Sequence, residues 1–73
     1  MEPFIKALET IARIMQDGVA THPDNDWTDR STGYYLAYAR AHLLLLRQGD
    51  LRHDHLAHAA THLLMALTLR ELG

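Results

Sequence analysis

Three histidines near the C-terminus, His55, His58 and His62, are spaced so that a helix places them on one face. At 3.6 residues per turn they fall within about 60° of one another, with Asp54 about 40° beyond His58 on the same side. This ladder can share a divalent metal through His58 and His62, with Asp54 as third ligand and Asp50 one turn earlier. No glutamate lies between His58 and His62, so the hydrolytic zinc signature is missing. The ladder can also contact a ligand, or pack against carboxylates and carbonyls, and the sequence favours packing.

A second group of residues, upstream of the ladder, has the composition of a nucleotide site. Its members are Trp27, Arg30, Tyr34, Tyr35, Tyr38, Arg40 and His42. An aromatic ring stacks on a base, and Arg together with a helix N-terminus receives phosphate. The alternative is structural, with the tyrosines filling an interface and Trp27 closing the end of a bundle, and without further information it is favoured.

Other chemistries are excluded by what the chain lacks. Ser31 has no convincing base nearby in sequence, and no Gly-rich phosphate loop is present, so acyl transfer and P-loop chemistry are dropped. Cysteine is absent, which removes disulfides, thiolate zinc sites and a cysteine nucleophile. The formal net charge of −2, from seven basic and nine acidic residues, argues against duplex nucleic acid as a partner. Six of the seven basic residues are Arg, which suits a small anionic ligand.

The length of 73 residues predicts one helical domain over residues 1–73. No run of about 18 apolar residues is present, and no basic and apolar leader precedes the first helix, so we expect a cytoplasmic protein without a membrane partner. Apolar spacing predicts an all-α fold with helices near residues 3–17, 30–48 and 51–72. Gly18 is expected to close the first helix, Thr28 or Ser31 to cap the second, and Asp50 to cap the third after a tight turn at Gly49.

The second and third helices have more apolar surface than three helices can hide. The second is apolar around nearly its whole circumference, from Tyr34 to Leu46, and the third carries two adjacent apolar stripes. We therefore expect a homo-oligomeric helical bundle built mainly through these two helices.

The stretch from His42 to Leu67 resembles a known family. The carrying residues are His42-Leu43, Gly49-Asp50, His55-Leu56-Ala57-His58-Ala59 and Leu63-Leu64, with looser agreement at Pro3, Ile11-Ala12, Gly18 and Asn25-Asp26-Trp27. They are similar to the phage-associated family named for dATP/dGTP diphosphohydrolase N-terminal domains, relatives of the MazG-like all-helical nucleotide pyrophosphohydrolases. The resemblance covers most of the chain, and its most specific part is the HLAHA string.

Two departures from the family pattern affect the expected chemistry. Ala41 stands where the pattern has Arg, so Arg40 would act from a different angle. MazG-like enzymes hold Mg²⁺ on helical carboxylates, often in Glu-x-x-Glu spacing, and this chain has no such pair, since Glu9 and Glu71 lie far apart. The resemblance thus implies nucleotide recognition more securely than hydrolysis.

We expect a small nucleotide-binding protein that sequesters a linear or cyclic nucleotide of host-defence signalling at a site shared between subunits. No cofactor is then needed, and a phage-encoded protein would act in the host cytoplasm. One alternative is a reduced Mg²⁺-dependent dNTP pyrophosphohydrolase using Asp50 and Asp54 from several subunits, and another is a structural helical interaction module. The ligand contacts are predicted to be His58, His55, Arg40, Trp27, His42, Arg30, Tyr34 and His62.

Overall fold

The computed structural model describes residues 1–21 and 27–73, and this part of the chain is helical throughout, with no strand. Its elements are α1 (Glu2–Thr21), the short 3-10 helix η1 (Trp27–Asp29), α2 (Thr32–Arg47) and α3 (His55–Leu72). The predicted all-α fold of three helices is confirmed. The homo-oligomer stays a prediction.

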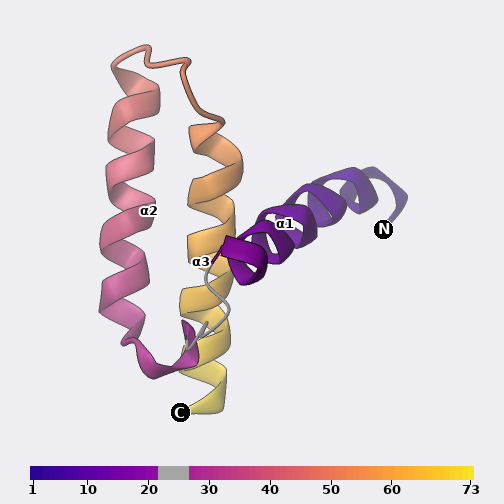
Figure 1. Ribbon diagram of the computed structural model, residues 1–73, viewed down its shortest axis with the longest axis vertical. Helices are drawn as coiled ribbons and strands as arrows, with labels where there is room; N and C mark the ends of the chain where they lie inside the picture. The colour runs from indigo at the N-terminus through magenta and orange to yellow at the C-terminus, as the bar shows by residue number, and fades with distance from the viewer. Residues whose placement is uncertain (22–26) are drawn as a thin grey trace.

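Helices α2 and α3 form an antiparallel hairpin, and α1 packs against α3 while projecting sideways from it (Figure 1). The core lies between the two hairpin helices. It is built mostly from small side chains, which include Ala39 of α2 and Ala59 and Ala66 of α3, each at most 3% exposed. Small residues let the two backbones approach closely, and this brings longer side chains on the same faces into contact.

The ends of the hairpin follow local rules. Ser31 caps α2, and its hydroxyl accepts a hydrogen bond from the backbone N–H of Tyr34 at 3.1 Å. Gly49 has φ of +81°, a left-handed conformation that glycine adopts without the penalty a side chain incurs. Two expectations are thereby confirmed: Ser31 as one of the two candidate caps, and Gly49 as the residue that stops the second helix.

Other expected boundaries are wrong. Gly18 does not close α1, because it keeps a negative φ and the helix continues to Thr21. Asp50 does not cap α3, since its carboxylate is bound by other partners. The cap is Asp54, whose Oδ1 accepts from the backbone N–H of Ala57 at 3.1 Å, so α3 begins at residue 55 rather than 51. The connection after α2 is therefore a loop over residues 48–54.

The chain leaves much apolar surface uncovered. Its accessible surface is 5784 Å², whereas a compact 8.3 kDa monomer is expected to expose about 4,600 Å². Phe4 and Leu8 of α1, Leu44 of α2, and Leu56 and Leu67 of α3 are all exposed. Such a surface is typical of a protein that associates, in keeping with the expected homo-oligomer.

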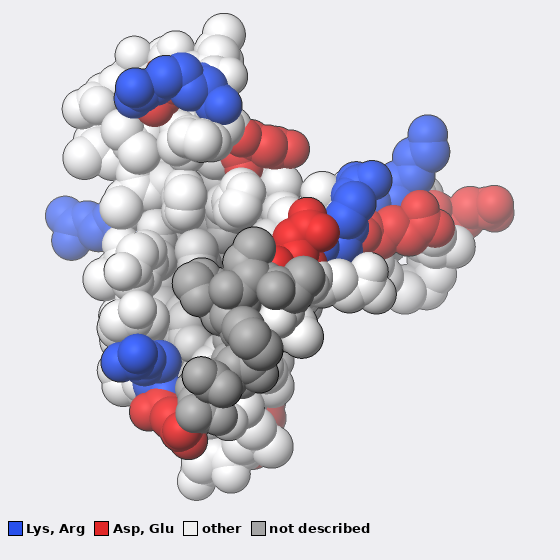
Figure 2. Space-filling view, in the orientation of Figure 1, with Lys and Arg blue, Asp and Glu red and all other residues white. Residues whose placement is uncertain are grey.

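Charged side chains on the face seen in Figure 2 gather along α1 and near the two ends of the hairpin, with both signs mixed. No described helix is long and apolar enough to cross a membrane.

Candidate functional site

Four imidazoles meet between the two hairpin helices. His42 comes from α2, and His55, His58 and His62 come from α3. The His42 ring lies 5.2 Å from His55, 5.3 Å from His58 and 5.4 Å from His62, measured between ring centroids. We call these four residues the histidine cluster. The three histidines predicted to share one face of α3 thus all contact one ring of the neighbouring helix, that of His42.

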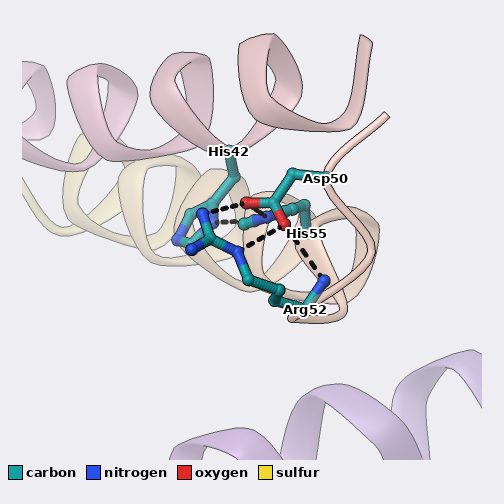
Figure 3. Close-up of polar contacts among 4 residues, drawn as sticks. All are labelled: His42, Asp50, Arg52 and His55. Atoms are coloured by element: carbon teal, nitrogen blue, oxygen red, sulfur yellow. Dashed lines mark hydrogen bonds and ion pairs between the residues drawn. The ribbon is translucent and has the colours of Figure 1, made fainter. Parts of the chain in front are cut away.

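A chain of hydrogen bonds runs from the 48–54 loop into the cluster (Figure 3). Asp50 binds the exposed Arg52 side chain through both carboxylate oxygens, at 2.9 and 3.0 Å. The Oδ2 atom of Asp50 also lies 3.1 Å from Nε2 of His55, and Nδ1 of His55 lies 2.9 Å from Nδ1 of His42. Asp50, His55 and His42 are hereafter the relay. Hydrogen bonds from the side chain and then the backbone N–H of Arg52, followed by His55, hold the pKa of Asp50 well below its ordinary value.

The other end of the cluster is aromatic. The His62 ring stacks on His42 at an interplanar angle of 13° and on Tyr35 at 17°. Its Nδ1 is buried and makes no hydrogen bond. Burial, followed by the neighbouring His58 ring, lowers the pKa of His62, although the backbone of His58 partly offsets this. Burial likewise lowers the pKa of His42, and the surrounding imidazoles, with His62 first, lower it further. Both rings are therefore held in the neutral form.

Tyr35 links the cluster to the start of the hairpin. Its hydroxyl donates to the carbonyl oxygen of Trp27 at 2.7 Å, and the two rings meet edge to face at 6.4 Å. Burial is the main reason why the pKa of Tyr35 is raised. Trp27 is half-buried by this contact, so its place at the end of the helical hairpin agrees with the structural alternative for this residue.

Two of the predicted contacts lie apart from the cluster. The Arg30 guanidinium lies 5.2 Å from the centre of the Tyr34 ring, at the exposed start of α2, and Tyr34 meets Tyr35 edge to face. Arg40 is exposed, and helix geometry places it about 160° around α2 from His42. Six of the eight predicted ligand contacts therefore belong to the histidine cluster or touch its aromatic end, namely Trp27, Tyr34, His42, His55, His58 and His62. Arg30 is connected only through Tyr34, and Arg40 is turned away.

Tyr35 belongs to the aromatic and basic group named from the sequence but is absent from the predicted ligand contacts, and Arg52 was not predicted at all. Tyr35, Ala39 and His42 follow the 4 and 3 spacing of one helix face, so periodicity could have aligned Tyr35 with His42. The pairing of Arg52 with Asp50 depends on the conformation of the loop and has no sequence signal.

A metal site is not assembled from the described residues. The carboxylate of Asp50 is bound by Arg52 and His55, and that of Asp54 caps α3. Within residues 1–21 and 27–73, no three His, Asp or Glu side chains are arranged to hold a metal ion. His22, Asp24 and Asp26 lie outside the described residues, as does Asn25, so nothing is concluded about them.

Fold and site together define an all-α unit whose helical hairpin encloses a hydrogen-bonded histidine cluster. The chain belongs to the family described as dATP/dGTP diphosphohydrolase, N-terminal, which it matches over residues 3–73. The resemblance carried by the HLAHA string is confirmed by this match. No curated protein and no solved structure matches the chain.

Proposed function

We propose that this protein binds a nucleotide at the histidine cluster and sequesters it without cleaving it. The observation that carries the proposal is the convergence of His42 on the three histidines of α3, next to the rings of Tyr34, Tyr35 and Tyr38. Imidazoles exchange hydrogen bonds with polar groups of a ligand, and aromatic rings stack on a base. Membership of a family named for enzymes that act on dATP and dGTP supports a nucleotide as the ligand.

The ligand is expected to lie at the edge of the cluster, against a second copy of the chain. His55 is only 2% exposed, whereas His58 and His62 are partly exposed and Tyr34 and Tyr38 more so. One chain therefore offers the rim of a site rather than an enclosed pocket. The surplus of exposed apolar surface supports closure of this rim by another subunit. A linear or cyclic nucleotide of host-defence signalling remains our expected ligand.

Hydrolysis is the second candidate, favoured by the family description alone. Hydrolysis of a phosphoanhydride bond by a MazG-like pyrophosphohydrolase needs Mg²⁺ on several carboxylates. Asp50 and Asp54 are already engaged within the chain, and Glu9 lies on the separate helix α1. A hydrolase would have to release these carboxylates and combine them across subunits, so sequestration requires fewer changes.

The test is a thermal-shift screen of linear and cyclic nucleotides with and without Mg²⁺. A ligand present at 100 times its Kd stabilises the folded state by about 2.7 kcal/mol, which raises the Tm of a small domain by roughly 10 °C or more. We expect such a shift in EDTA, with the nucleotide recovered intact by chromatography. Cleavage that requires Mg²⁺ would favour the hydrolase instead, and no shift with any nucleotide would favour a structural module.

His58→Ala identifies the site, and His53→Ala is its matched control. His58 stacks on His42 within the cluster, whereas His53 is exposed in the loop. Loss of one ligand hydrogen bond is expected to weaken binding about 10-fold or more in His58→Ala only. Light scattering that gave about 8 kDa, the mass of one chain, for the nucleotide-bound protein would contradict a site shared between subunits.

A further inference from the structure

The relay determines which of its atoms carry hydrogens. Asp50 is ionised, because it accepts hydrogen bonds from the Arg52 guanidinium and the Arg52 backbone N–H. An ionised carboxylate can only accept. The atom of His55 that faces Asp50, its Nε2, must therefore carry a hydrogen and donate it.

The next step along the relay follows from the first. A neutral imidazole carries one hydrogen, so a neutral His55 with its hydrogen on Nε2 has a bare Nδ1. At 2.9 Å from Nδ1 of His42, this bare nitrogen must accept, and His42 must donate from its own Nδ1. A neutral His42 then has no hydrogen left for Nε2. With both imidazoles neutral, Asp50 thus determines, through His55, that His42 presents a lone pair at the far side of its ring.

That lone pair is accessible. Among the described residues, the side chain of His42 forms a hydrogen bond only with His55, through Nδ1, and none uses its Nε2. The one buried side-chain nitrogen or oxygen without a partner in the described part of the chain is Nδ1 of His62. His42 is half-buried, and its Nε2 is not a second such atom, so this nitrogen is available to a ligand at the rim of the site.

We propose that Nε2 of His42 is the hydrogen-bond acceptor that recognises an N–H or O–H group of the nucleotide, an amino group of the base or a hydroxyl of the sugar. This inference rests on the proposed nucleotide binding and names the part of the ligand that meets the cluster. A phosphate oxygen does not fit there, because two acceptors facing each other repel. The phosphates of the ligand are therefore bound by other groups.

A second proton on the His42 and His55 pair would reverse this polarity. When both ring nitrogens of His55 carry hydrogens, His55 donates from its Nδ1 to Nδ1 of His42. The single hydrogen of His42 then lies on its Nε2. In that state His42 is a donor and could bind phosphate, with Asp50 balancing the added charge. Binding of phosphate at His42 would thus take up one proton, whereas binding of an amino or hydroxyl group takes up none.

The first test needs no ligand. Imidazole ¹⁵N resonances of the full chain at pH 7.5 should show His42 protonated at Nδ1 and bare at Nε2, and His55 with the opposite arrangement. His53→Asn, which removes an exposed histidine outside the relay, should leave both patterns unchanged and simplify their assignment. A hydrogen on Nε2 of His42 would overturn the inference whether or not any nucleotide binds.

The second test uses a nucleotide identified by thermal shift, compared with analogues that lack one base amino group or one sugar hydroxyl. We expect one analogue to bind the unsubstituted chain about 10-fold more weakly than the complete nucleotide does. His42→Phe should bind this analogue and the complete nucleotide equally well. Calorimetry at pH 7.5 in buffers of different ionisation enthalpy should show no proton uptake. Uptake of one proton, with all analogues bound equally, would assign a phosphate to His42 and overturn the inference. If no nucleotide binds, the proposed function and this recognition step both fail, while the NMR result still decides where the hydrogens lie.

Discussion

His55→Ala is expected to be the most damaging single histidine substitution for the fold of the hairpin. His55 is the one large side chain in the described part of the chain that is fully buried, at 2% exposure. It joins the 48–54 loop to α2 through its hydrogen bonds to Asp50 and His42. Alanine removes both hydrogen bonds and leaves the space of an imidazole empty. His42 also loses the acceptor for its Nδ1.

The cost can be worked from these contacts. Two hydrogen bonds of a buried side chain contribute about 1 kcal/mol each, and the lost packing of the ring adds about 1 kcal/mol. The expected loss in free energy of unfolding is therefore about 3 kcal/mol. A chain of 73 residues has a total stability of about 4–11 kcal/mol, so the variant retains little margin. The corresponding fall in Tm is roughly 12–24 °C.

Urea unfolding followed by circular dichroism and by Trp27 fluorescence measures this loss. His53→Ala is the matched control, because His53 lies two residues away, is exposed and makes no side-chain hydrogen bond within the described structure. We expect it to change the stability by less than about 0.5 kcal/mol. A loss below 1 kcal/mol for His55→Ala, or equal losses for the two variants, would refute the relay as a structural element.

Three further predictions concern other parts of the hairpin. Tyr35→Phe keeps the ring but leaves the Trp27 carbonyl without its donor, so it should cost about 1 kcal/mol in urea unfolding; a stability equal to the parent would show that water replaces this bond. Gly49→Ala meets no atom within 4 Å but must adopt a φ of +81°, so we expect a loss of about 1 kcal/mol, with a smaller loss in Gly49→Asn. Because folding lowers the pKa of His42 and His62, the unfolded chain binds more protons below about pH 6.5, and stability should fall as the pH drops from 7.5 to 5.5; an unchanged or rising stability would contradict the neutral rings.

Local rules in the sequence determined the helices and much of their ends. The 3.6-residue spacing of apolar side chains predicted three helices, the preference of Ser for the N-cap marked the start of α2, and the freedom of glycine marked its end at Gly49. The same periodicity placed His55, His58 and His62 on one face of α3. The HLAHA string was the most specific part of the family resemblance, which the match over residues 3–73 confirms. All of these depend on residues within one or two turns of each other.

Only the tertiary structure decided what the histidine face meets. His42 is 13 residues from His55, and their contact depends on the register of α2 against α3 in the packed hairpin. The direction of Arg40, by contrast, follows from its spacing of two residues from His42 on the same helix, which turns it away from the cluster.

Asp50 and Asp54 show the same division between local and tertiary causes. Both have the side chain of a helix cap, and local rules predicted Asp50 in that role. The loop brings Asp50 to Arg52 and to the buried His55, which removes it from capping and leaves that role to Asp54. A carboxylate binds whichever donors the fold brings within reach, and these donors come from elements whose relative positions are determined only when the hairpin closes.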